Sequence, residues 1–343
     1  MTGAPYPQVA WRVVLDGLDL TDRIAPRLLD LTLTESRGDE ADQVDLRVHD
    51  HDGRVALPRR GVALQLAIGW RDSGLFDKGT FVVDDVEHSG APDILTIRAR
   101  SADLTGAVRR RRERSWHDTT LGAILGTIAG EHSLRASIAE DLAKVRVPHL
   151  DQANESDINL LTRLGKRFDA VATVKAGTLV FAPIGAGTTA SGQPLPAVTI
   201  VRASGDQHRF SVSDRDTYTG VRAYWGDRSA ARRKAVLVGT DKNEKKLQPT
   251  YATESEARQQ AQAEFQRLGR GTAQLSYRLA LGRADIYPEQ TVNVSGFKPE
   301  IDGTDWLVVK ATHTIDGGSG FVTALELERG GGSTEESSAS RSA

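Results

Sequence analysis

Apolar and polar residues alternate through much of the first hundred positions of the chain. Segments that follow or approach this period-two pattern lie at 44–48, 62–68, 81–83 and 94–98. Alternation of this kind is typical of strands with one buried and one exposed face. Asp52-Gly53 and Ser89-Gly90 supply turn residues between the segments. The pattern therefore predicts an antiparallel β domain over residues 1–108.

The spacing of the apolar positions changes beyond a charged run at 109–114. Apolar residues three and four apart predict three helices, at about 119–128, 154–168 and 253–268. Short apolar strands are expected at 171–174 and 179–181. The first two helices and these strands predict a mixed helix and strand domain over residues 115–197.

Alternating segments return in the last third of the chain, at 221–225, 235–238, 291–294, 307–311 and 321–328. They predict a second β domain over residues 198–329. Thr253 and Glu256 fit a capping box at the start of the third helix, which we place in a helical insertion at about 241–272. The Gly- and Ser-rich residues 330–343 predict a disordered tail.

The two β domains share an internal repeat. Phe81–His88 aligns with Trp306–His313, because each segment begins with an aromatic residue, continues with apolar residues and ends on His. Alternating segments flank both copies, at 66–70 and 94–100 in the first and at 292–297 and 321–329 in the second. A fainter match relates a candidate hairpin at 31–48 to another at 221–238. Two unrelated β-hairpins would also look alike at this level.

The repeat predicts the fold class. We expect an α+β protein, predominantly β, in which two similar small antiparallel tube-type β-barrels flank the mixed middle domain. A homotrimer of such a chain would carry six similar barrels in a ring, which is a physical way for a three-fold object to meet a six-fold one.

Composition narrows the class of protein only slightly. Hydrophobic residues make up 39% and charged residues 26% of the 343 positions, and the formal net charge is -2. This balance lacks the basic excess of a nucleic-acid-binding protein. Cys is absent, which excludes disulfides and thiolate chemistry. We expect neither a membrane-spanning helix nor a secretory signal, because no apolar stretch reaches about 18 residues and the N-terminus lacks a basic segment before an apolar one.

Four segments invite a chemical interpretation, and each also has a plainer one. His49–Gly53 (HDHDG) offers metal-ligand residue types but reads as a polar loop with an Asp-Gly turn. The Gly-rich loop at 185–192 lacks the Gly-Lys-Ser/Thr of a phosphate-binding loop, and Gly317–Gly320 reads as a hairpin tip. The run Arg109–Arg114 could touch phosphate, although a solvated surface or a subunit contact is favoured. We therefore predict no catalytic, cofactor-binding or metal-ligating residue, and we assign no interface residues.

Four pieces of the chain carry a resemblance to a known family, at 115–122, 152–164, 177–181 and 255–261. The most specific is Gln152–Leu164 (QANESDINLLTRL), which looks like the segment QxNESDxxxLxRL of the late control D family of phage tail proteins. The resemblance covers roughly residues 1–330. Members of this family form the baseplate hub of contractile tails and related injection systems.

The resemblance implies a trimeric hub that joins a hexameric tail tube to a central spike. The spike would be a separate polypeptide, with a tape measure protein and other baseplate proteins as further candidate partners. Assembly is expected in the bacterial cytoplasm and use in a virion, a tailocin or an extracellular injection particle. Two alternatives stay open at this point, a tail-associated cell-wall hydrolase and a module that binds a host surface or a payload.

Overall fold

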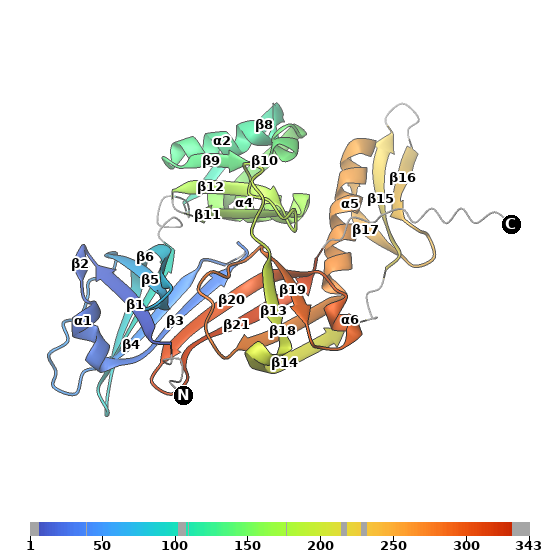
Figure 1. Cartoon of the computed structure of the whole chain (residues 1–343). Helices are drawn as coiled ribbons and strands as arrows, with labels where there is room; N and C mark the ends of the chain where they lie inside the picture. Colours follow the sequence, from blue (N-terminus) through green and yellow to red (C-terminus); the bar gives the residue numbers. More distant parts are fainter. Residues whose placement is uncertain are drawn as a thin grey trace.

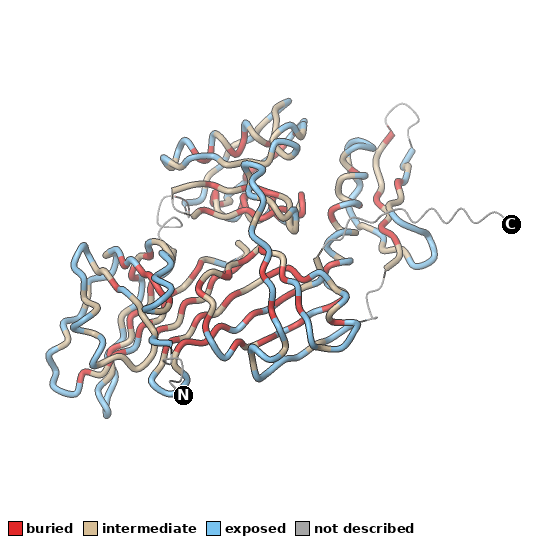
Figure 2. Tube along the Cα trace, viewed as in Figure 1, coloured by how far each residue is buried: buried red, intermediate tan, exposed pale blue. Residues whose placement is uncertain are grey.

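The structure is a computed structural model that describes residues 7–38, 40–101, 108, 110–175, 177–213, 218–227 and 232–330. Figure 1 shows a long β layer, a mixed domain above its middle, and a small helix and sheet unit beside that domain. Buried positions follow the inner faces of the strands and helices in all three parts (Figure 2). The expectation of a predominantly β, α+β protein is confirmed.

The first sheet unit is built from the N-terminal strands. Its strands are β1 (Val9–Leu15), β2 (Leu18–Asp19), β3 (Leu28–Ser36), β4 (Gln43–His49), β5 (Ala63–Trp70), β6 (Gly74–Ser89) and β7 (Ile94–Ser101), with α1 (Thr21–Ile24) after β2. They lie in the order β3-β4-β7-β6-β5-β1-β2. Alternating residues such as Leu31, Leu33 and Phe81 fill one core, as the period-two pattern predicts.

The second sheet unit comes from the C-terminal strands. Its elements are β13 (Val198–Val201), β14 (Gly205–Val212), β18 (Ala273–Leu279), β19 (Thr291–Ser295), α6 (Pro299–Asp302), β20 (Trp306–Asp316) and β21 (Gly320–Arg329). They lie in the order β14-β18-β21-β20-β19-β13. Trp306 is fully buried in their core with Leu325 and Leu327, and its indole N–H donates to the carbonyl of Ile301 over 3.0 Å.

The two sheet units repeat one strand order. In sequence order, β1, β3, β4, β5, β6 and β7 occupy the same places in the first unit as β13, β14, β18, β19, β20 and β21 in the second. The one difference in sense is that β1 lies antiparallel to β5, whereas β13 lies parallel to β19. The repeat that aligns Phe81–His88 with Trp306–His313 is therefore confirmed at the level of topology.

Irregularities in the ladders repeat at equivalent positions. A register shift between Val83 and Asp85 in β6 matches one between Val308 and Lys310 in β20. Val83 and Val308 each exchange two backbone hydrogen bonds with the segment that leads into the preceding strand of their unit. Two further shifts lie at the starts of β3 and β14. Because bulges are specific structural features, their coincidence supports the residue alignment of the repeat.

Two expectations need correction. The strands do not close into two separate barrels: within the described residues, β20 also pairs with β3, so both units belong to one sheet of 13 strands. Residues 221–238 are not the counterpart of the hairpin at 31–48 either. They form β15 (Gly220–Asp227) and β16 (Arg232–Gly239), which lie outside that sheet. The counterparts of β3 and β4 are β14 and β18.

A helix and three strands are inserted between β14 and β18. β15 pairs with β16 and with β17 (Glu244–Tyr251), and α5 (Glu254–Gly271) packs on this small sheet. Thr253 caps α5 as predicted, since its hydroxyl oxygen accepts a hydrogen bond from the amide of Glu256 over 3.2 Å. The inserted unit thus begins near Gly220, earlier than the helical insertion expected at about 241–272.

The middle domain contains the two other predicted helices. Its elements are β8 (Arg111–Thr120), α2 (Leu121–Glu131), β9 (Arg135–Ile138), α3 (Glu140–Ala143), β10 (Arg146–Ser156), α4 (Asp157–Phe168), β11 (Ala170–Lys175) and β12 (Thr178–Pro183). The apolar faces of α2 and α4 and the inner faces of β11 and β12 share one core. The predicted tail falls almost wholly on residues 331–343, which lie outside the described residues.

Candidate functional site

The segment Gln152–Leu164, the most specific motif of the sequence, forms the end of β10 and the start of α4. Asn154 takes a positive φ of 50° where the chain turns toward the helix. Ser156 caps α4, because its hydroxyl oxygen accepts a hydrogen bond from the amide of Asn159 over 3.3 Å. The polar residues Asn154 and Ser156 of the motif therefore have a structural role at a strand-to-helix junction.

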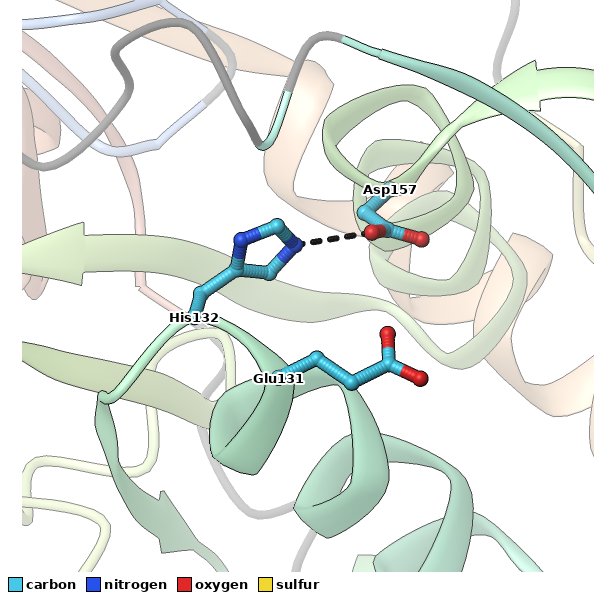
Figure 3. Close-up of side chains that lie close together, drawn as sticks. All are labelled: Glu131, His132 and Asp157. Atoms are coloured by element: carbon cyan, nitrogen blue, oxygen red, sulfur yellow. Dashed lines mark hydrogen bonds and ion pairs between the residues drawn. The ribbon is translucent and has the colours of Figure 1, made fainter.

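Asp157 is the centre of this junction and is fully buried. Its carboxylate accepts hydrogen bonds from Arg114 Nη2 over 2.6 Å and from Gln152 Nε2 over 2.9 Å. Figure 3 shows its contact with His132, whose Nε2 lies 2.8 Å from the second carboxylate oxygen. Burial alone would raise the pKa of Asp157. Hydrogen bonds from Gln152 and His132 and the charges of Arg114 and Arg112 outweigh it, so the pKa lies below its ordinary value.

Among the described residues, Glu131, His132 and Asp157 form a group whose ligand atoms lie within 4.8 Å of one another. Figure 3 shows the His132 ring turned toward Asp157, with the Glu131 carboxylate beside it. Arg112 Nη1 and Arg114 Nη1 lie 2.9 and 2.8 Å from Glu131 oxygens. Two guanidinium groups thus already supply the positive charge that a metal ion would bring, and the group is best described as an ion-pair network around the buried Asp157 of the middle domain.

The other segments that invited a chemical interpretation also have structural roles. In the loop His49–Gly53, Asp50 accepts a hydrogen bond from the amide of Val55 over 2.9 Å, and Asp52 pairs with Arg27. Gly317–Gly320 lies at the tip between β20 and β21, as predicted. The charged run at 109–114 was expected to be a solvated surface or a subunit contact. Two of its members, Arg112 and Arg114, are partly exposed and pair with Glu131 and Asp157 of the same chain.

A second charge network joins the parts of the molecule. Arg270 at the end of α5 pairs with Asp169 after α4 and, over 3.1 Å, with Glu328 of β21. Arg37, after β3, pairs with the same Glu328 over 2.6 Å and with Glu289. These five residues come from both sheet units, the middle domain and the insertion. Because breaking a buried pair leaves a charge without compensation, the network fixes how the parts meet.

Some large apolar side chains of the sheet units are exposed to solvent. In the part of the chain that the structure describes, the large apolar residues exposed to solvent are Leu18, Leu57, Leu75, Phe76, Val201, Val212 and Leu281. All seven belong to the two sheet units, and the middle domain and the insertion contribute none of those described. Leu75 and Phe76 are neighbours in β6, so this part of the strand is a candidate contact surface. No sequence pattern distinguishes these residues, because six of them lie in or beside strands and Leu57 lies in the loop between β4 and β5.

The sheet units also have free strand edges. β14 pairs with β18 alone, and β13 pairs with β19 alone, within the described residues. Unpaired N–H and C=O groups along such edges are ready to pair with another strand. The candidate functional surfaces of this protein are therefore the edges and exposed apolar residues of the sheet layer.

Among the described residues, the helices lack the combination of length and hydrophobicity that spanning a lipid bilayer requires.

Comparison with known proteins agrees with this architecture. Two proteins that are each named probable baseplate hub protein match 93% of the chain and 92% of their own length. The one from Escherichia phage 186 is 44% identical over 360 residues, and the one from Escherichia phage P2 is 45% identical over 358 residues.

Solved structures share the fold at low sequence identity. The 43 kDa tail protein of prophage MuSo2 from Shewanella oneidensis has a TM-score of 0.67 at 16% identity, over 93% of this chain and 98% of that protein. An Escherichia coli component of the type VI secretion system, described as similar to bacteriophage T4 tail proteins, has a TM-score of 0.57 at 12% identity, over 88% and 73%. The phage tail baseplate hub (GPD) family matches residues 43–319. The chain belongs to this family of phage tail baseplate hub proteins.

Proposed function

We propose that this baseplate hub protein acts as a trimeric adaptor between a six-fold tail tube and a central spike. The observation that carries the proposal is the repeated order of six strands in the two sheet units. Three chains would present six similar units around an axis, which matches the symmetry of a hexameric tube. The exposed apolar residues of both units would be covered on assembly.

The partners follow from the same reasoning. One end of the ring would bind the tail tube protein and the opposite end a separate spike protein, with the tape measure protein and other baseplate proteins as further contacts. Binding would be non-covalent and without turnover, since the clustered carboxylates of the middle domain, the exposed Glu131 and the buried Asp157, are both paired with Arg114. A phage baseplate hub is a component of the virion, and we propose that this one assembles in the bacterial cytoplasm.

The mass of the native protein tests the adaptor. We expect three times the 37.1 kDa chain mass for the protein alone, or three hub chains per complex once the spike protein is added. A chain that stays monomeric at assembly concentrations with the spike present would overturn the proposal. A zymogram on peptidoglycan tests the alternative of a cell-wall hydrolase, and we expect no clearing.

Tube binding is tested by one exposed apolar residue. Phe76 is exposed on β6, so Phe76→Asp should weaken co-purification with the tube protein if this face contacts it. Asp72→Asn, in the turn just before β6, is the matched control and should bind normally. Equal binding by both variants would exclude this face of the first sheet unit from the tube contact.

A further inference from the structure

One strand pairing joins the two sheet units inside the chain, and the repeat defines what an equivalent pairing between chains would be. Residues 310–316 of β20 pair with residues 30–36 of β3 in antiparallel sense; we call this pairing the seam. In the repeat, β6 stands in the place of β20 and β14 in the place of β3. The positions of the bulges make Asp85 the equivalent of Lys310 in the repeat, and Gln207 the equivalent of Asp30.

The two equivalent edges are free in the single chain. β6 pairs with β5 only as far as Val82, and its residues 85–89 pair with β7 alone. β14 pairs with β18 alone. No strand within the described residues covers the outer edge of either segment. Each edge thus offers one strand of a pairing equivalent to the seam and lacks the other strand.

Burial at equivalent positions shows what the missing partner would cover. His313 is fully buried beside β3, whereas the side chain of its equivalent His88 is 40% exposed. Glu35 is buried beside β20, whereas its equivalent Val212 is 58% exposed. Val212 thus adds an exposed apolar side chain to a free strand edge, and such an edge is ready to pair with a strand of another chain.

The two free edges cannot meet within one chain. β6 and β14 lie in different sheet units toward opposite ends of the β layer (Figure 1). A contact between different surfaces of successive copies is head-to-tail, and such contacts generate closed rings when the rotation closes. The occupant that fits the β14 edge is therefore β6 of a second copy of this chain.

We propose that β6 of one subunit pairs antiparallel with β14 of the next, in the register that β20 adopts against β3. This inference rests on the proposed trimer and specifies its interface. The seam register, with Ala311 opposite Glu35 and His313 opposite Leu33, translates into Val86 opposite Val212 and His88 opposite Phe210. Two partly exposed valines would then be buried against each other, and Glu87 would lie diagonally across from Arg209, within reach of a cross-strand charge pair.

Cysteine cross-linking tests the register, because the chain has no Cys of its own. The double variant Val86→Cys, Val212→Cys is treated at native concentration with a short bifunctional maleimide and run on a denaturing gel. Each contact joins Val86 of one chain to Val212 of the next, so we expect covalent dimers and trimers. Each single variant should stay monomeric on the gel.

The pair Val86→Cys, Ser211→Cys is the matched control. Ser211 precedes Val212 and points to the opposite face of β14, so the yield of cross-linked trimer from this pair should be several-fold lower. A native trimer in which both pairs cross-link equally, or neither does, would overturn the strand pairing and leave the proposed function standing. A native monomer in the presence of the spike would overturn both.

Discussion

Glu35 places a carboxylate on the seam between the two sheet units. Lys78 Nζ lies 2.6 Å from it and His313 Nε2 lies 3.1 Å away. Burial alone would raise its pKa, but the hydrogen bond from His313 and the charge of Lys78 lower the pKa to about 2. Burial also lowers the pKa of His313, which fits a neutral ring at the seam.

The Glu35 carboxyl makes stability depend on pH. In the unfolded chain it takes up a proton near its ordinary pKa of 4.5, whereas in the folded chain it does so only near 2. Between these values the unfolded state holds more protons, so acid destabilises the fold, by about 3 kcal/mol over the whole window. Its stabilisation is complete above about pH 4.5 and is lost as the pH falls toward 2.

We expect the free energy of unfolding of the wild type to fall more steeply between pH 5 and pH 3 than that of Glu35→Gln, which cannot titrate. Denaturant titration at each pH measures both slopes. The variant should be less stable at pH 7, because Lys78 loses its buried partner. Parallel pH profiles would contradict the assignment of this slope to Glu35.

At the residue scale, local pattern could suggest His313 but not its role. The repeat singled out His88 and His313 by alignment, yet their surroundings differ, since His88 approaches Asp50 and His313 approaches Glu35. Glu35 lies 278 positions from His313 in the chain. No periodicity in a single sequence connects residues so far apart, so the charge group at the seam could not be predicted.

At the scale of elements, the helices were the most predictable part. α4 was expected at 154–168 and is found at Asp157–Phe168, with Leu160, Leu161 and Leu164 buried. A helix carries its own periodicity and caps, and these signals are local. The assignment of strands to sheets was less predictable. The hairpin at 221–238 exists as a hairpin, but which sheet a hairpin joins depends on distant partners.

Leu161 gives the prediction that belongs to α4. It is 1% exposed in the core of the middle domain, so Leu161→Ala should reduce the free energy of unfolding by roughly 2–5 kcal/mol. Lys166→Ala on the exposed side of the same helix is the control and should change it by less than about 0.5 kcal/mol. Denaturant unfolding measures both values. A loss below about 0.5 kcal/mol at Leu161 would contradict its burial.

At the scale of the whole molecule, the sequence predicted two similar β domains but not their fusion. The repeat showed that the domains share a plan, and the strand order confirms it. Closure into separate barrels was inferred from that similarity and from the family resemblance. The continuous sheet arises because β20 pairs with β19 over its first residues and with β3 over the rest. A strand that pairs with two neighbours in succession has the same local alternation of apolar and polar residues as any other strand, so this arrangement could not be predicted from the sequence.

Leu325 tests whether the second sheet unit is needed for assembly. It is 1% exposed in the core of that unit, and a buried aspartate there should cost more than about 4 kcal/mol. Leu325→Asp should therefore abolish hub assembly in a particle-assembly assay. Ala324→Asp, at the exposed neighbouring position, should leave the protein folded. Normal particles with Leu325→Asp would show that the second unit is not the structural element proposed.

The C-terminal residues 331–343 should be dispensable. Their composition of Gly, Ser, Thr, Ala and charged residues lacks the large apolar side chains of a core. We expect a chain that ends at Gly330 to keep the melting temperature and the native mass of the full chain. A shift of several degrees, or a change in oligomeric mass, would show that this segment makes stabilising contacts.

The seam has a consequence for how the chain is made. β3 must wait for β20, whose residues are synthesised some 278 positions later. At about 5–20 residues per second, the growing polypeptide carries the uncovered edge of β3 on the ribosome for roughly 15 to 55 seconds. During that time the edge is open to strands of neighbouring nascent chains. Yield of soluble hub should therefore depend on translation speed and chaperone supply.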